Sequence, residues 1–421
     1  MQLAAKLKGW AQRVAAVALV SLVAACGGGG GSNSSNSSSN NSLPANPAAQ
    51  PVAATAANTA PITVGPGAAN VINIPTVTVT VCVPGTSTCQ SIPNVQVDTA
   101  SYGLRLVSSV LNSTMQNSLP NAAVPTGSGT LVECTNFADG YSWGSVRTAT
   151  VQIGGETAAS IPVQVLGDVS FLVPSGCASG AEENTVSALG ANGILGIGVA
   201  PYDCGSACAS STTFAQDSNY YACSGVNCTK TQVPTTNQVA NPVKHFAADN
   251  NGVIVEMAQV SNNGSGSATG TLVFGIGTQP NNALAASQTF TTNAAGDLAN
   301  STFNGSRLTA FFDSGSNAYF FADSSLPLCG SNFSGFYCPT SGQTRSVNVV
   351  GLNGASTTAN VGILSASTLF SNGNNFAFND LAGQVGSASS FDIGLPFFYG
   401  RYMYFGIDQT ATGGQAPYIG Y

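Results

Sequence analysis

A short segment built around an aspartate occurs twice in this chain, and the repeat constrains the possible fold more than any other feature. Val-Asp-Thr-Ala-Ser at residues 97–101 recurs as Phe-Asp-Ser-Gly-Ser at residues 312–316, which places Asp98 and Asp313 215 residues apart. Apolar residues flank both copies. Duplication of a whole lobe would leave such a repeat, so we predict two related lobes.

The sequence between and around the two copies is typical of strands and turns. Residues 71–81 largely alternate β-branched and other residues, which is the pattern of a half-buried strand. Clusters of Gly, Asn, Ser and Pro separate the apolar runs. We therefore predict an all-β chain with two short helices, at 104–111 and 365–370. Further predicted strands lie at 146–153, 161–165, 253–257, 272–274 and 346–350.

The N-terminal residues have the features of an export signal. Basic residues precede an apolar run at 14–23 that is too short to span a bilayer comfortably, and small residues lead up to Cys26. This ending resembles the bacterial lipobox, which implies cleavage before Cys26 and its lipidation. An ordinary secretory signal with a chance cysteine is the alternative. Because Gly27 follows the cysteine, we expect anchoring in the outer membrane of the bacterial cell envelope.

The residues after Cys26 are Gly, Ser, Asn, Ala and Pro without any charge up to about residue 60. Such a composition buries too little apolar surface to offset the entropy lost on ordering, so it predicts a flexible linker. The Gly/Ser/Asn stretch at 261–270 could join two halves. The expected organisation is a lipoprotein signal peptide at 1–25, the lipidated cysteine and linker at 26–70, a first lobe at 71–265 and a second lobe at 266–421.

Charge and cysteine content limit which partners and which cellular compartment fit this chain. The chain has 10 Lys and Arg against 17 Asp and Glu with no basic cluster, which argues against nucleic acid. Of 11 cysteines, 10 remain besides Cys26, an even number that suits disulfides outside the cytosol. A zinc site is the alternative. Local loops are expected for Cys82/Cys89 and Cys329/Cys338, while the connectivity among Cys204, Cys208, Cys223 and Cys228 stays open.

The candidate catalytic groups are carboxylates. His245 is the single histidine and has no nucleophile motif nearby, so a Ser-His-Asp or Cys-His mechanism has little support. Two carboxyls held about 3 Å apart share one proton, so that one can activate water while the other polarises a carbonyl. Asp98 and Asp313 fit this role. The hydroxyls of Thr99 and Ser314 would brace the two turns, those of Ser101 and Ser316 would hold the outer carboxylate oxygens, and Gly315 would allow close approach.

The order of several motifs resembles the pepsin family of aspartic peptidases. Residues 98–106 resemble Asp-Thr-Gly-Ser-x-x-Leu-Trp-Val, and Tyr141, Trp143, Gly144 and Ser145 resemble the family's flap. The resemblance implies a two-lobed fold with double-ψ β-barrel lobes, a flap over the cleft, and no metal or organic cofactor. The chain also resembles a set of uncharacterised bacterial lipoproteins that share this arrangement of motifs. Further matching segments are 150–155, 192–198, 271–277, 391–398 and 402–408.

Three departures from the family pattern bear on activity. Ala100 replaces a Gly, and its methyl group would lie where the two turns approach. Arg105 replaces a Trp; it could pair with a carboxylate and depress that group's pKa, or face solvent. The flap, judged from the spacing of Tyr141 to Val151, is about four residues shorter than usual.

The leading hypothesis is an envelope-anchored, monomeric aspartic endopeptidase that takes a peptide or protein into the interlobe cleft. A catalytically inactive surface lipoprotein, which would bind a peptide or glycan in the same groove, is the main alternative. A third possibility is an unrelated β-sandwich adhesin.

Overall fold

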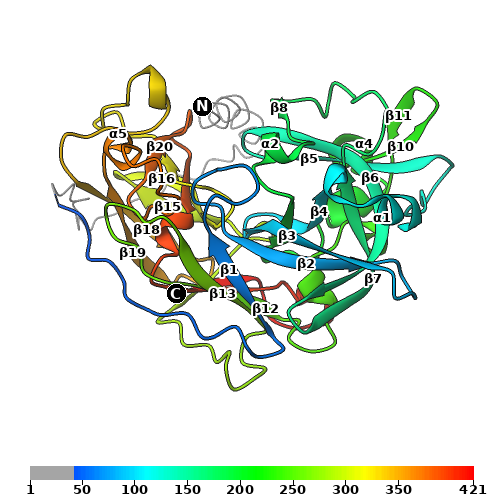
Figure 1. Cartoon of the computed structure of the whole chain (residues 1–421), viewed down its shortest axis with the longest axis horizontal. Helices are drawn as coiled ribbons and strands as arrows, with labels where there is room; N and C mark the ends of the chain where they lie inside the picture. The colour runs from blue at the N-terminus through cyan, green and yellow to red at the C-terminus, as the bar shows by residue number, and fades with distance from the viewer. Residues whose placement is uncertain (1–41) are drawn as a thin grey trace, which may run out of the picture.

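A computed structural model of the chain describes residues 42–421 (Figure 1). The predicted signal peptide at 1–25 and the lipidation site Cys26 lie outside the described residues. Strands dominate the part that is described, and its helices are all short. Among residues 42–421, no helix is long and apolar enough to span a membrane.

The first lobe contains a closed barrel. Strand pairings lead from β6 through β7, β4, β9, β3 and β2, and the ring closes because β2 also pairs with β6. The side chains of Val79, Val95, Leu104 and Leu106 point inward and are fully buried. The barrel strands are β2 (Thr76–Cys82), β3 (Cys89–Asp98), β4 (Tyr102–Val107), β6 (Gly140–Ile153), β7 (Glu156–Leu166) and β9 (Gly193–Ile197).

A hairpin layer extends this barrel on one side. Strand β5 pairs with β6, and β10 and β11 continue the sheet outward from β5. Disulfides Cys134–Cys177, Cys204–Cys208 and Cys223–Cys228 tie down these strands and the loops beside them. The elements are β5 (Thr130–Asn136), β8 (Ala181–Glu182), β10 (Tyr220–Ser224), β11 (Asn227–Lys230), α1 (Ser113–Ser118), α2 (Val186–Leu189), α3 (Ser206–Ala209), α4 (Phe214–Asp217), η2 (Ser108–Val110), η3 (Thr235–Asn237) and η4 (Pro242–His245).

The second lobe is a separate sheet with an aromatic core. Phe321 stacks on Phe391 with ring centroids 4.5 Å apart, and Phe303 meets both rings edge-on. Disulfide Cys329–Cys338 closes a loop at its edge. Its elements are β15 (Leu298–Phe303), β16 (Ser306–Asp313), β17 (Tyr319–Phe321), β18 (Gln343–Val350), β19 (Ser356–Ile363), β20 (Ala382–Gln384), β21 (Ser390–Gly394), α5 (Ala366–Leu369), η5 (Ser331–Phe333) and η6 (Leu395–Phe397).

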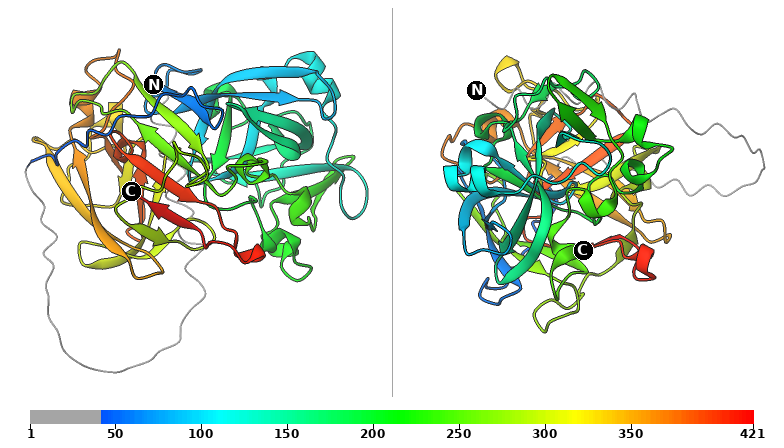
Figure 2. Two further views of the ribbon diagram at one scale, coloured as in Figure 1. Left: turned by 90° about the horizontal axis from the view of Figure 1, so that it is seen from below. Right: turned by 90° about the vertical axis from the view of Figure 1, so that its right-hand side faces the viewer.

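An antiparallel platform joins the two lobes. Its strands come from the start, the middle and the end of the described chain, in the order β1-β13-β12-β22-β23-β14. Figure 2 shows blue, green and red strands next to one another in this region. The elements are β1 (Thr59–Val64), β12 (Gly252–Met257), β13 (Ala268–Phe274), β14 (Thr289–Thr291), β22 (Tyr402–Gly406), β23 (Tyr418–Gly420) and η7 (Thr410–Thr412).

The two lobes repeat one local topology around the predicted aspartates. In the first lobe β9 lies parallel to β3 and antiparallel to β4, with Asp98 opposite Gly196. In the second lobe β21 lies parallel to β16 and antiparallel to β17, with Asp313 opposite Gly394. The prediction of an all-β, two-lobed, pepsin-like fold is thereby confirmed.

Two local predictions were wrong. Of the helix predicted at 104–111, only η2 (Ser108–Val110) is helical; residues 104–107 belong to strand β4, because Leu104 and Leu106 are buried and the strand pairs on both sides. The linker expected up to residue 70 includes strand β1, and residues 42–58 run along the second lobe and the platform. There the amide of Ala49 donates to the carbonyl of Gly400 over 3.0 Å. Composition could not reveal this, because the segment finds its partners elsewhere in the chain.

Candidate active site

Asp98 and Asp313 end equivalent strands and are held by equivalent turns. Asp98 Oδ1 accepts a hydrogen bond from the amide of Ala100 at 2.8 Å, and its Oδ2 lies 2.5 Å from Ser101 Oγ. Asp313 Oδ1 accepts from the amide of Gly315 at 2.7 Å, and its Oδ2 accepts from Ser316 Oγ at 2.9 Å. The serines thus occupy the positions expected from the sequence.

The two turns are braced against each other by buried hydroxyl groups. Thr99 Oγ1 donates to the carbonyl of Phe312 at 3.0 Å and accepts from the amide of Ser314 at 2.9 Å. Ser314 Oγ donates to the carbonyl of Val97 at 2.7 Å. Each turn therefore fixes the position of the other, and the two copies together form one site.

The braced turns bring the two carboxyl groups next to each other, beside Gly315. Desolvation raises the pKa of Asp313 well above its ordinary value, and the charge of Asp98 raises it further. A Cβ atom added at Gly315 would lie 2.8 Å from Asp98 Cγ and 2.9 Å from Asp313 Oδ1. Only glycine fits there. The pair is consequently suited to hold one proton between two oxygens.

Ala100 does not separate the pair. Its side chain is exposed and lines a cavity beside the carboxyls, while the corresponding Gly315 takes the crowded position. The added methyl group, which from the sequence could have pushed the aspartates apart, is exposed at the cavity instead.

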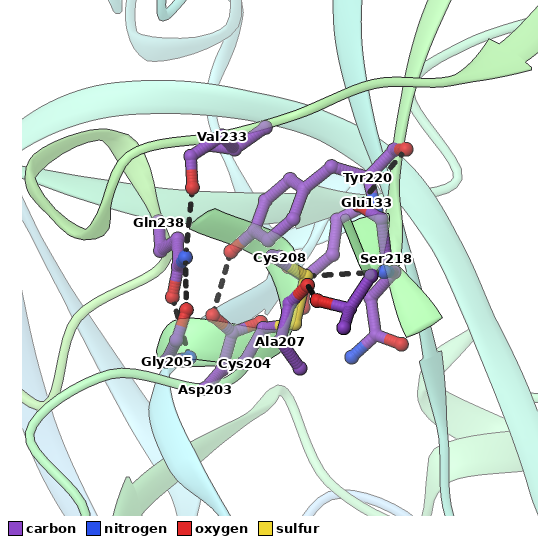
Figure 3. The surroundings of a disulfide bond; sticks show 12 residues. Glu133, Asp203, Cys204, Gly205, Ala207, Cys208, Ser218, Tyr220, Val233 and Gln238 are labelled. Atoms are coloured by element: carbon purple, nitrogen blue, oxygen red, sulfur yellow. Dashed lines mark hydrogen bonds between the residues drawn. A yellow bond between two sulfur atoms is a disulfide. The ribbon is translucent and has the colours of Figure 1, made fainter. Parts of the chain in front are cut away.

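Arg105 is fully buried and pairs with carboxylates outside the dyad. Its Nη2 lies 2.7 Å from Glu133 Oε1 and 3.3 Å from Asp203 Oδ2, and its Nη1 donates to the carbonyl of Tyr102 at 2.6 Å. In Figure 3 the hydroxyl of Tyr220 points at Asp203, to which it donates at 2.6 Å. Burial opposes ionisation, yet the Arg105 charge holds the pKa of Glu133 below its ordinary value. Asp203 behaves differently, since burial and Glu133 raise its pKa.

The residues predicted for the flap lie away from the cleft. Tyr141 and Trp143 are buried in a cluster on β6, and the Trp143 ring packs edge-on against Tyr221 at 5.3 Å. Ser145 is buried and its amide donates to Asp168 at 2.9 Å. Gly144 is packed against β7, where an added Cβ would lie 1.9 Å from the carbonyl oxygen of Val165.

The hairpin turn that reaches the aspartates is formed by residues 137–139. Tyr141 pairs with Asn136 at the base of this turn, so the predicted flap begins four residues too late. Phe137 and Ala138 line both cavities beside the carboxyls, and Asp139 lines one of them. The flap length inferred from the sequence was counted from Tyr141 and stays a prediction. The Asp-Gly pair at 139–140 is a hairpin-turn signal that could have located the tip.

Two cavities flank the carboxyl pair beneath this turn. The larger has a volume of about 380 Å³ and is bounded by Ala100, Tyr102, Asp203 and Phe311 besides the aspartates. The smaller, of about 110 Å³, reaches Ile74, Gln96, Ile194 and Phe320. An extended chain lying over the aspartates could place side chains in both.

The zinc alternative is contradicted. Cys204 is bonded to Cys208 and Cys223 to Cys228, so these cysteines provide no thiolates. Within residues 42–421, no group of three or more His, Cys, Asp or Glu side chains could hold a metal ion. The disulfides expected for Cys82/Cys89 and Cys329/Cys338 are confirmed.

A third carboxyl near the pair was missed from the sequence. Asp392 on β21 is fully buried, and its Oδ2 lies 2.5 Å from Ser316 Oγ. The signal was available, because an aspartate inside an apolar strand that packs on both sides is unusual. Its neighbours could not be read from the sequence, since Ser316 is 76 residues away.

Fold and site together define a two-lobed, pepsin-like β protein with a pair of carboxyls in its cleft. The chain belongs to the family described as "Protein of unknown function (DUF3443)", whose model matches residues 54–421. Among solved structures, it is similar to the aspartic proteinase from Irpex lacteus, with 17% identity and a TM-score of 0.48, over 87% of this chain and 97% of that one. No curated protein matches the sequence.

Proposed function

We propose that this protein is an aspartic endopeptidase in which Asp98 and Asp313 activate a water molecule. The single observation that carries the proposal is the close approach of these two carboxyls beside Gly315, on turns held together by reciprocal hydrogen bonds at the base of a cleft. Two aspartates so close, beside open cavities and without a cation as partner among residues 42–421, serve no evident structural purpose.

The chemistry follows from one proton shared by two acids. The ionised carboxylate takes a proton from water as the water attacks the peptide carbonyl carbon, while the protonated carboxyl donates its proton to the carbonyl oxygen. Proton transfer back to the amide nitrogen then allows the C–N bond to break. The hydrogen bonds from Ser101 and Ser316 fix the outer oxygens, and the turn at 137–139 would cover the substrate and exclude water.

Cleavage of a peptide library by the purified protein at pH 3 to 6 tests this function. We expect the wild type to cleave and Asp313→Asn to lose at least about a thousandfold in rate, because the pair then lacks its second acid. Asp217→Asn, at an exposed position, is the matched control and should retain full activity. Absence of cleavage in the wild type would contradict the proposal.

The same assay separates the enzyme from a non-catalytic binding protein. A protein that only holds a peptide or glycan in this groove would bind without cleaving, and Asp313→Asn would leave its turnover at zero. Ala100, whose methyl group could have separated the carboxyls, is exposed at the cavity and gives this alternative no support.

We also propose that the protein is tethered by a lipid on Cys26 to the bacterial cell envelope, at the outer membrane. The lipobox-like residues before Cys26 support this location. Cys26→Ser should move the protein from the membrane fraction to the soluble periplasmic fraction and abolish labelling by a radioactive fatty acid. Unchanged membrane association of this variant would contradict the anchor.

A further inference from the structure

The hydroxyl of Ser316 lies between two carboxyl groups. Its Oγ is 2.9 Å from Asp313 Oδ2 and 2.5 Å from Asp392 Oδ2. A serine hydroxyl carries one hydrogen and can donate to only one of them. The other contact is a hydrogen bond only if the carboxyl supplies the proton. At least one of the two acids must therefore be protonated for both contacts to hold.

The surroundings of Asp392 decide which acid keeps that proton. Asp392 pairs with Phe311 on β16 and Phe320 on β17, and the charged groups that act on it are the acids Asp313 and Asp98. Its Oδ1 is buried and has no hydrogen-bond partner within the described part of the chain. A carboxylate buried without a cation or donors is costly, so the neutral form is favoured. Burial raises the pKa of Asp392 well above its ordinary value, and the charge of Asp313 adds to this effect.

The first lobe has no counterpart to this acid. On β21, Asp392 lies two residues before Gly394; Asp392 faces Phe311 on β16, and Gly394 faces Asp313. In the first lobe, Gly196 on β9 faces Asp98, and the residue two positions before Gly196 is Ile194. A carboxyl thus stands behind Asp313 where an apolar side chain stands behind Asp98. The two halves of the dyad differ in this respect, although their turns are alike.

We propose that Asp392 is a positioning residue of the carboxyl pair: a neutral acid that donates its proton to Ser316 Oγ and so directs the Ser316 hydroxyl at Asp313. This arrangement provides Asp313 with a hydrogen bond that favours its ionised form and so partly offsets the burial that raises its pKa. When Asp392 loses its proton, the carboxyls of Asp313 and Asp392 compete for the single hydrogen of the Ser316 hydroxyl. A second negative charge then lies beside the dyad. The role in catalysis rests on the proposed peptidase function; the protonation of Asp392 does not.

Protonation is tested without any substrate. Infrared spectra of the wild-type protein at pH 7 should contain a carboxylic-acid C=O band that disappears in Asp392→Asn, which retains the shape and a donor. In Ser316→Ala the Asp392 band should remain but shift. If the spectrum of Asp392→Asn equals that of the wild type, Asp392 is ionised at pH 7 and the proposal fails, whatever the protein cleaves.

The pH profile of cleavage tests the positioning role. Asp392→Asn cannot ionise, so we expect the alkaline limb of kcat/KM to move up by about one pH unit or more. Asp392→Ile, which copies the first lobe, removes the donor and should lower kcat about tenfold at the optimum, with KM little changed. If the pH profiles of both variants coincide with that of the wild type, Asp392 has no positioning role, even if the infrared spectra show that it is protonated. Should Asp392→Ile fail to fold, the isosteric Asn variant decides.

Discussion

Thr99 and Ser314, one from each lobe, hold the two halves of the site together: Thr99 Oγ1 accepts the Ser314 amide proton at 2.9 Å, at the point where both chains turn. The same oxygen donates to the carbonyl of Phe312 at 3.0 Å. Position and orientation of the two aspartates therefore depend on contacts between residues 215 apart in sequence.

Thr99→Val should weaken this junction. The substitution keeps the shape but removes the hydroxyl that pairs with the buried amide of Ser314 and the carbonyl of Phe312, which costs about 1–3 kcal/mol of unfolding free energy. Thermal or urea unfolding measures the loss. The exposed Thr229→Val should change stability by less than about 0.5 kcal/mol. Equal stability of the Thr99 variant and the wild type would show that the brace contributes nothing.

Arg105→Gln should destabilise the first lobe strongly. Glu133 and Asp203 would then be buried without their cation, and breaking such a pair costs about 3–5 kcal/mol. Arg307→Gln, on the exposed surface of β16, is the control and should be nearly neutral. A small effect of the Arg105 substitution would mean that Arg105 has no structural role as the buried partner of these acids.

Phe137→Ala should impair peptide cleavage more than any change at Tyr141. Phe137 lines both cavities at the tip of the hairpin, whereas the Tyr141 ring packs on the outer side of β6. We expect kcat/KM to fall roughly tenfold for Phe137→Ala, equivalent to about 1.4 kcal/mol of transition-state stabilisation. Tyr141→Phe should leave it unchanged. If Tyr141→Phe lowered kcat/KM more than Phe137→Ala, the flap would lie at Tyr141, as the sequence suggested.

Asp380 should make the fold less stable toward neutral pH. Burial raises its pKa to about 7, so the folded chain binds its proton more tightly than the unfolded chain does. The resulting stabilisation is present in acid and is lost as pH rises from about 4 through 7. Asp380→Asn should therefore flatten the pH dependence of unfolding over this window. An unchanged slope would show that Asp380 titrates normally.

The sequence was sufficient for those parts of the site that depend on local contacts. The bonds from Ala100 and Ser101 to Asp98 span two and three residues, so a short motif specifies them, and its repetition at Asp313 indicates a second lobe. Partners distant in sequence could not be assigned. Arg105 meets Asp203 across 98 residues, and only folding brings them together.

The flap shows how a motif can mislead. Tyr-Ser-Trp-Gly-Ser resembles the family's flap in letters, but its alternating side chains pack against the hairpin layer and β7. The turn that covers the cleft, at 137–139, has little resemblance to the motif and is defined by the register in which Asn136 faces Tyr141. Strand register depends on pairing, which a single sequence does not display.

The central claim is that Asp98 and Asp313 together bind a tetrahedral reaction centre. A crystal structure of the protein with a statine-containing peptide tests it most directly, because the statine hydroxyl stands in for the attacking water. We predict that this hydroxyl lies between the two carboxyls, within hydrogen-bonding distance of both, with residues 137–139 closed over the peptide. A peptide bound elsewhere, or none bound at acid pH, would contradict the account.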